Sequence, residues 1–169
     1  MIRILGIDPG SQITGYGIID VEGRHSRYVD SGCIRLEARP LPERLRMIFE
    51  SITTIITTYR PDEMAIEQVF MHRNPDSALK LGQARGVAIC AGVMVDLPVS
   101  EYAPRAIKQA VVGSGGAGKE QIQYMVCALL NLQPGLQADA ADALAAALCH
   151  GHTKHTLSRL AEATRGKRR

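Results

Sequence analysis

The sequence contains no tryptophan and few aromatic residues, which make up 4% of its 169 residues. Its cysteines form no Cys-x-x-Cys pair, so the spacing of a zinc ribbon or a redox motif is missing. No apolar run approaches the length of a membrane span, and the N-terminus lacks the charged and apolar regions of a secretory signal. We therefore predict a cytoplasmic protein in a reducing compartment. Its cysteines are expected to be small buried side chains, namely Cys33, Cys90, Cys127 and Cys149.

The balance of residue types is that of one globular domain. Hydrophobic residues make up 46% and charged residues 22%, and the length is sufficient for a sizeable core. Residues 153–169 carry six basic residues and one acidic residue, whereas residues 1–152 carry 14 basic and 16 acidic residues. We predict a domain over residues 1–152 and a basic tail over residues 153–169. For that tail, contact with a polyanion and solvated disorder are both open interpretations.

A short apolar run over residues 4–8 ends in a carboxylate. The run is typical of a strand buried on both faces, and Pro9 and Gly10 then turn the chain. An ionised Asp8 at the end of a core strand costs free energy unless something compensates its charge. Asp8 is either a cap for the turn or a functional group, and this run alone leaves both interpretations open.

The first half of the chain predicts an antiparallel meander followed by a helix and a strand. Strands are expected over residues 14–20 and 25–36, a helix over 41–59, and a strand over 63–67 that again ends in a carboxylate. A strand, a helix and a strand in this order predict a parallel, right-handed crossover. Gly10, Gly15 and Gly17 leave the strand ends bare, and we interpret them as room for a ligand backbone.

A long helix is predicted from an N-cap at Asp76 to about residue 95. Ala78, Gly82, Gly86 and Cys90 recur every four residues along it. Two glycines on one helical stripe need a packing reason, because glycine costs about 1 kcal/mol relative to alanine there. Close packing on the protein's own sheet and a helix-to-helix dimer contact both explain the stripe.

The second half of the chain adds one strand and three helices. We predict a strand over residues 99–102, a helix that starts at Pro104, a glycine-rich loop over 113–118, and helices over 119–130 and 137–148. The elements together predict a mixed α/β domain in which a five-stranded sheet combines an antiparallel meander with parallel strands and is flanked by helices.

Four carboxylates stand out from the seventeen acidic residues. Asp8 and Glu67 end two strands that should be parallel, and parallel strands present their carboxyl ends at one edge where ligands bind. Asp139 and Asp142 share one face of an Ala-rich helix, where two like charges destabilise the helix. The helix dipole explains one acidic residue near the helix start but hardly two.

Clustered carboxylates of this kind need cations. Hard oxygen ligands select Mg²⁺, and Mn²⁺ can substitute for it. Two such ions roughly 3.5–4 Å apart are a standard arrangement for displacement at phosphorus. The residues therefore predict metal-dependent hydrolysis of a phosphodiester.

The sequence resembles the RuvC family of Holliday-junction resolvases over essentially its whole length. The similar motifs are Gly6-Ile-Asp-Pro-Gly10 with Thr14-Gly-Tyr-Gly17, Ile66-Glu-Gln-Val-Phe70, Leu81-Gly-Gln-Ala-Arg-Gly86 and Ala138-Asp-Ala-Ala-Asp-Ala-Leu144. The resemblance implies a ribonuclease-H-like fold, a homodimer, and paired symmetric nicks in four-way junction DNA during recombination and repair. It implies that Asp8, Glu67, Asp139 and Asp142 are catalytic and bind two Mg²⁺ ions, and that the enzyme works with a RuvA–RuvB branch-migration complex.

The resemblance also assigns contacts with DNA. Phe70 follows Glu67 in a loop without helical periodicity, and we interpret it as an apolar wedge against bases rather than as a residue folded onto the core. Gly113 to Lys119 nearly match a nucleotide-binding loop, but Glu120 stands where a hydroxyl residue is needed. The predicted DNA contacts are Phe70, Arg73, Lys108 and Lys119, and the stripe of Ala78, Gly82 and Gly86 is the predicted dimer interface.

Two other functions explain part of the sequence. A nucleotide-binding module of the actin or sugar-kinase type also has an acidic residue and glycine after its first strand, but it leaves Glu67, Asp139 and Asp142 unexplained. A DNA-binding module without catalysis is the second. A zinc site at Cys149 and the histidines that follow it is disfavoured, because a second cysteine pair is missing.

Overall fold

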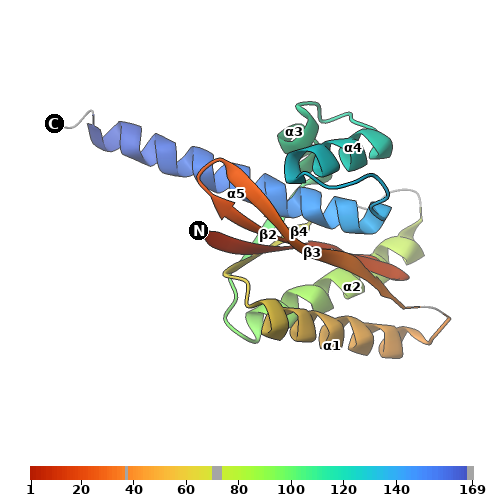
Figure 1. The fold of residues 1–169 in the computed structure, drawn as a ribbon. Coiled ribbons are helices and arrows are strands. Elements are labelled where there is room, and N and C mark those ends of the chain that lie inside the picture. Colours follow the sequence, from red (N-terminus) through yellow and green to blue (C-terminus); the bar gives the residue numbers. More distant parts are fainter. Residues whose placement is uncertain (37, 70–73, 167–169) are drawn as a thin grey trace.

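A mixed sheet forms the middle layer of the molecule (Figure 1). The structure is a computed structural model that describes residues 1–36, 38–69 and 74–166, without the side chains of residues 165 and 166. Within these residues the sheet has five strands in the order β3-β2-β1-β4-β5. The strands are β1 (Ile2–Asp8), β2 (Ile13–Glu22), β3 (His25–Arg35), β4 (Glu63–Glu67) and β5 (Val99–Tyr102).

The order of the strands agrees with the predicted topology. β1, β2 and β3 pair antiparallel as a meander, while β4 pairs parallel with β1 on one side and with β5 on the other. Asp8 and Glu67 consequently end β1 and β4 at the same edge of the sheet, which confirms the prediction for both strand ends. We refer to this edge as the catalytic edge.

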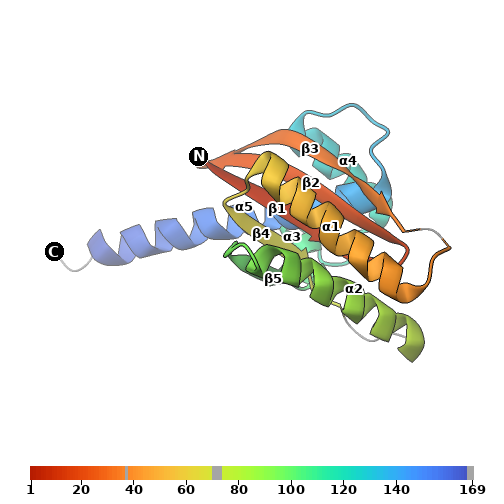
Figure 2. The same ribbon diagram turned by 90° about the horizontal axis from the view of Figure 1, so that it is seen from below.

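Two helices cover one face of the sheet, as Figure 2 shows from below. They are α1 (Leu41–Tyr59) and α2 (Pro75–Val93). The predicted helix over residues 41–59 is confirmed, and its Ile48, Ile52, Ile55 and Ile56, at three- and four-residue spacing, are buried. Successive side chains on a strand point to opposite faces, so Leu5 and Ile7 of β1 pack into the core under α1 and α2.

The other face is covered by α3 (Pro104–Val112), α4 (Lys119–Leu130) and α5 (Ala138–Gly166), of which α5 lies directly on the sheet (Figure 1). Ile4 of β1 and Ala65 of β4 contribute to this second core. An even number of residues separates Asp8 from Ile4 on β1 and Glu67 from Ala65 on β4, so each pair shares one face of the sheet. Asp8 and Glu67 therefore end their strands on the side of α5.

Glycines of β1 and β2 allow α5 to approach the sheet closely. A Cβ atom added at Gly6 would overlap the Ala143 carbonyl oxygen, and one added at Gly15 would overlap the Asp139 carbonyl oxygen. Gly17 faces the Leu144 side chain in the same way. Our interpretation of Gly15 and Gly17 as room for a ligand is wrong, because the backbone that approaches them is the protein's own helix.

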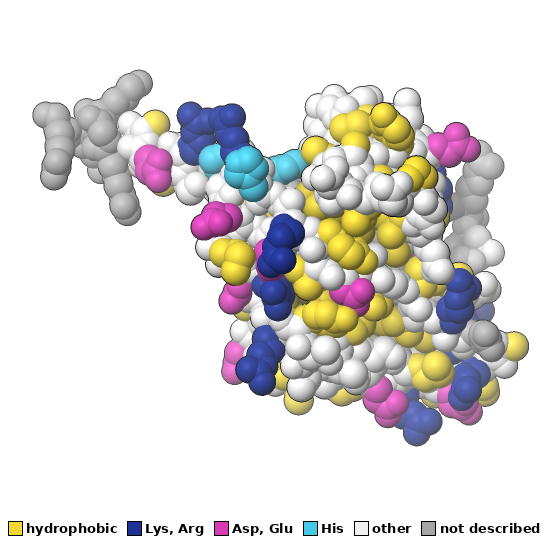
Figure 3. All heavy atoms as spheres, viewed as in Figure 1, with side chains coloured by type: hydrophobic (Ala, Val, Ile, Leu, Met, Phe, Trp, Pro, Cys, Tyr) yellow, Lys and Arg dark blue, Asp and Glu magenta, His cyan; other side chains and the backbone are white. Residues whose placement is uncertain are grey.

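Two helix boundaries differ from the prediction. α2 is capped by Asn74 rather than Asp76: the Asn74 side chain accepts hydrogen bonds from the Asp76 and Ser77 amides, and Pro75 occupies the first helical position, where no amide is needed. α5 does not end near residue 148 but continues through the predicted tail to Gly166. Histidine and basic side chains gather where this extension leaves the body (Figure 3), namely Arg24, His152, His155 and Arg159.

The outer face of α2 is open to solvent. Cys90 is exposed, which contradicts the prediction that all four cysteines are buried; only Cys149 is buried, and Cys33 and Cys127 are half-buried. A Cβ atom added at Gly82 or Gly86 would meet nothing within 4 Å. Packing on the protein's own sheet therefore does not explain these glycines, and of the two explanations the dimer contact remains. None of the described helices is long and apolar enough to cross a membrane.

Candidate active site

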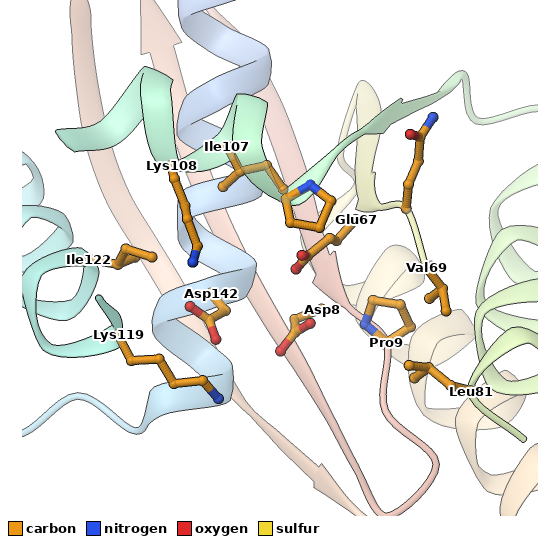
Figure 4. A pocket seen from close by; sticks show the side chains of 12 residues that line it. Asp8, Pro9, Glu67, Val69, Leu81, Ile107, Lys108, Lys119, Ile122 and Asp142 are labelled. Atoms are coloured by element: carbon orange, nitrogen blue, oxygen red, sulfur yellow. The ribbon is translucent and has the colours of Figure 1, made fainter. Parts of the chain in front are cut away.

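Three of the four predicted carboxylates line one pocket of about 370 Å³ at the catalytic edge. Asp8 comes from the end of β1, Glu67 from the end of β4, and Asp142 from the beginning of α5. Figure 4 shows their side chains directed into the same hollow. The position of each follows from the fold, because parallel strands end together and α5 begins above their ends.

The segments that carry the carboxylates are fixed by hydrogen bonds. The buried Thr14 hydroxyl donates to the Gly10 carbonyl at 2.9 Å and accepts from the Gly10 amide at 3.3 Å, which closes the turn after Asp8. Arg85 of α2 donates to the Glu67 carbonyl at 3.1 Å and pairs with Glu101. Arg85 thereby supports the end of β4.

Burial and repulsion between like charges disfavour ionisation of Asp8. Burial is the largest cause, followed by the charges of Glu67, Asp142 and Asp139, and together they raise the pKa of Asp8 to about 8 despite an opposing effect of Lys119. A carboxyl group at the end of a core strand therefore keeps its proton near neutral pH in the absence of cations. The interpretation of Asp8 as a mere turn cap does not account for three acidic neighbours.

The other two lining carboxylates show the same effect. Burial, and next the charge of Asp142, raises the pKa of Glu67. Burial also raises the pKa of Asp142, with Asp139 adding to the effect and Lys119 and Lys108 opposing it. Each group is harder to ionise because of the others, which is the electrostatic signature of a site built for bound cations.

Lys108 and Lys119 line the pocket on either side of Asp142, across from Asp8 and Glu67 (Figure 4). Lys108 belongs to α3, and Lys119 is the first residue of α4, where the Gly118 amide donates a hydrogen bond to the Gln121 side-chain oxygen at 2.9 Å. Figure 4 shows both amines directed toward the carboxylates. The charges of the two lysines oppose the rise in the pKa of Glu67 and Asp142. The structure thus brings these two predicted DNA contacts beside the acidic centre, and their contact with DNA stays a prediction.

Asp139 stands slightly apart from the other three carboxylates. It lies one helical turn before Asp142 and does not line the pocket, although its charge reaches both Asp8 and Asp142. Within the described part of the chain, no three acidic, histidine or cysteine side chains lie close enough together to hold one ion directly. The four predicted carboxylates therefore lie at one edge of the sheet, but they do not all surround a single position for one ion.

The donor chemistry of this set fits divalent cations. All the candidate ligands are carboxylate oxygens, which favour Mg²⁺ and Mn²⁺ over softer metals. Burial and, after it, repulsion from neighbouring carboxylates raise the pKa values of Asp8 and Glu67, and a cation would relieve that repulsion. We conclude that the residues present suit a magnesium site at the catalytic edge.

Two predicted DNA contacts, Phe70 and Arg73, lie outside the described residues. Two side chains of the disfavoured zinc site have other partners: Cys149 donates to the Ala106 carbonyl, and His150 contacts the Tyr102 hydroxyl at 2.7 Å and Glu63 at 2.5 Å. These contacts connect α5 to α3 and to the strands β4 and β5.

Comparison with known protein sequences identifies close relatives. The family model described as crossover junction endodeoxyribonuclease RuvC matches residues 4–150. A protein from Aliivibrio fischeri with that name is 60% identical over 169 residues, which covers 100% of this chain and 98% of the relative. The similarity thus extends across the catalytic edge and all the helices around it.

Solved structures give the same result for the fold. RuvC from Thermus thermophilus, in a structure described as a complex with a Holliday junction substrate, matches with a TM-score of 0.86 and 31% identity over 92% of this chain and 96% of that one. The yeast mitochondrial Holliday junction resolvase matches with a TM-score of 0.58 and 14% identity, over 89% and 81% of the two chains, and this likeness shows the fold alone. A ribonuclease-H-like architecture is therefore confirmed.

Proposed function

The chain belongs to the RuvC family of crossover junction endodeoxyribonucleases, and we propose that it cleaves four-way DNA junctions with Mg²⁺ bound by Asp8, Glu67, Asp139 and Asp142. It is a Holliday-junction resolvase, an endonuclease of DNA recombination and repair. The observation that carries the catalytic assignment is the convergence of three carboxylates, from three separate elements, on one pocket that two lysines also line.

The proposed catalytic and DNA-binding side chains have different roles. The carboxylates hold the cations, which supply Lewis-acid stabilisation of the charge that develops on the phosphate and acidify a water for attack. Lys108 and Lys119 attract the phosphate and offset the charge of the carboxylates. Phe70 and Arg73 remain the proposed contacts to the bases and backbone near the crossover.

We expect cleavage of a four-way junction to require Mg²⁺. The wild-type protein with Mg²⁺ should place paired nicks at symmetric positions in two opposite strands, and the same protein in EDTA should leave every strand intact, because uncompensated carboxylates repel the phosphate. Mapping the products on end-labelled strands measures both the dependence and the symmetry. A linear duplex of the same sequence serves as the control substrate, and efficient nicking in EDTA would contradict the metal assignment.

A homodimer formed through α2 completes the proposal, because two-fold symmetry presents two catalytic edges to two equivalent strands. Small or apolar residues form a stripe on the outer face of α2 at helical spacing: Leu79, Gly82, Cys90 and Val93 are exposed, and Gly86 between them is half-buried. Leu79 is 69% exposed and Val93 is 57% exposed, and glycines between them let two helices approach closely.

The change of Gly86 to Leu tests the dimer. A large side chain in the middle of the stripe holds the two helices apart, so we expect the dimer dissociation constant to rise by roughly 100-fold, the equivalent of about 3 kcal/mol. Sedimentation velocity over a concentration series measures it. Ala128→Leu, an exposed change on α4, is the matched control. A Gly86→Leu protein that stays dimeric at wild-type concentrations would rule out this interface.

The nucleotide-binding alternative is not favoured. The proteins that match over the whole chain are named as junction endonucleases, and the acidic residues that this alternative left unexplained lie together at the catalytic edge.

A further inference from the structure

A second hollow of about 500 Å³ opens beside the catalytic edge, and three arginines line it. Arg35 is the last residue of β3, Arg39 precedes α1, and Arg44 lies in the first turns of α1. Gln12 and Ile13, in the turn that follows Asp8 and at the start of β2, form the rest of the wall with Ala38. We call this hollow the arginine pocket.

The described partners of these arginines leave much of their charge available. Arg35 donates to the Gln137 side-chain oxygen at 3.5 Å and Arg44 to the Ser11 carbonyl at 2.8 Å, and both acceptors are uncharged. Arg39 lies 3.9 Å from Glu43, and both side chains are about half exposed, so that pair is weak. The Arg44 Nε atom is buried and has no hydrogen-bond partner among the described residues. A buried guanidinium donor without an acceptor is costly, and an anion in the pocket would remove that cost.

The beginning of α1 adds to the positive potential of the pocket. Pro40 occupies the N-cap position, and no side chain caps the first turn. The helix dipole places partial positive charge at this end of α1, which disfavours cations nearby, so Arg39 and Arg44 stand where the helix itself repels them. The Glu43 and Arg44 amides donate to the Pro40 carbonyl and Pro42 has no amide, so the first turn offers few free donors. A bound phosphate group would be attracted mainly by the guanidinium groups, and the helix dipole would add to the attraction.

The register of the sheet gives the distance from the catalytic residues. Asp8 pairs with Gly15, which pairs with Cys33, and Arg35 lies two residues beyond Cys33 on β3. Strands are about 4.8 Å apart and residues about 3.4 Å apart along a strand, so the Cα atoms of Asp8 and Arg35 are roughly 12 Å apart.

We propose that the arginine pocket binds a backbone phosphate of the junction DNA, a few nucleotides away from the phosphate that is cleaved. The proposal rests on the proposed function, because it concerns the DNA that lies across the catalytic edge. Lys108 and Lys119 line the acidic pocket from α3 and α4, and the arginine pocket is formed by the end of β3 and the beginning of α1. Figures 1 and 2 show that α3 and α4 cover one face of the sheet and α1 the other. A DNA strand that crosses the acidic centre is thereby held by basic side chains on both sides.

The salt dependence of junction binding tests the pocket. Binding is measured in EDTA over a salt series for the wild type, for the double variant Arg35→Gln/Arg39→Gln, and for Arg44→Gln. Each phosphate contact that is lost should make the slope of log K against log salt shallower by about 0.9, and should weaken binding about eight-fold at 0.1 M salt. The double variant leaves the bond from Arg44 to the Ser11 carbonyl in place, so its result does not depend on the turn that Arg44 supports.

Arg46→Gln is the matched control, because it removes the same charge from α1. Its side chain is 69% exposed, lies two residues after Arg44, and does not line the pocket. We expect its slope and affinity to stay at the wild-type values. Glu37, which lies outside the described residues, is left unchanged in every variant.

Two results would overturn the proposal. One is a wild-type slope in both the double variant and Arg44→Gln, and the other is weaker binding with an unchanged slope, which would indicate a structural role. Failure of the proposed function gives a different result, since the wild type itself would then neither bind nor cleave the junction. A wild type that cleaves, together with variants that keep its slope, would overturn the arginine pocket alone.

Discussion

Replacing Asp8 by Asn lowers the rate of junction cleavage by roughly 1,000-fold or more while the protein still binds the junction. Asn keeps the shape of the side chain, but it removes the charge that would hold a cation between Glu67 and Asp142. Changes of a central catalytic group have effects of this size or larger. Single-turnover cleavage of a labelled junction measures the rate, and a gel-shift titration measures the binding. A variant that nicks at the wild-type rate would show that the carboxylate pocket is not the catalytic centre.

The same substitution should stabilise the protein when metal is absent. Burial and acidic neighbours raise the pKa of Asp8 from 3.8 to about 8, so the folded state holds a proton that the unfolded state releases between these values. The free energy of unfolding contributed by this proton is fully present below pH 3.8 and is lost as the pH rises through 8. We expect the wild type in EDTA to lose stability from pH 5 to pH 8.

The comparison with Asp8→Asn isolates this effect from the titration of other groups. The variant has no proton to lose at this position, so its stability should fall less over the same range, and at pH 8 it should exceed the wild type by an amount on the order of a few kcal/mol. A smaller slope remains, since the pKa values of Glu67 and Asp142 are raised as well. Adding Mg²⁺ should stabilise the wild type more than the variant. Urea unfolding of both proteins at pH 5 and at pH 8, each with and without Mg²⁺, measures these differences.

The catalytic edge could be predicted from sequence because its geometry follows from strand direction. Apolar runs that end in Asp8 and Glu67, separated by one long helix, imply parallel strands whose ends meet. The bounds of α1, β4, β5 and α4 were also predicted correctly, since apolar periodicity and the flanking glycines and prolines define them.

Other features depend on which segments meet in space, and a sequence does not contain that information directly. Gly15 indicated a close approach of some backbone, but only the fold shows that α5 is that backbone. The arginine pocket combines residues from a turn, a strand end and a helix start that share no motif. The length of α5 was missed because its apolar pattern ends near residue 148, whereas the residues that follow form a helix with an exposed surface.

Replacing Gly6 by Ala should strongly destabilise the protein. The added methyl group would overlap the Ala143 carbonyl oxygen and lie 2.9 Å from the Ala147 amide nitrogen, and both are backbone atoms of α5 that no side-chain rotation can move. Overpacking of a core costs about 1–3 kcal/mol and occasionally more, and we expect a loss of about 3 kcal/mol here because a whole helix must shift. Urea unfolding at pH 7 measures the loss as a lower midpoint with an unchanged slope.

The same substitution should reduce cleavage beyond its effect on folding, because α5 carries Asp139 and Asp142. Moving α5 away from β1 separates Asp142 from Asp8 across the pocket, so the rate should fall even at a temperature where the variant is fully folded. Gly116→Ala is the matched control: the added methyl group meets only the Ser114 hydroxyl, at 4.0 Å, in an exposed loop. Its stability should equal or slightly exceed that of the wild type. Wild-type stability and cleavage in Gly6→Ala would show that α5 does not rest on β1 as closely as the glycine allows.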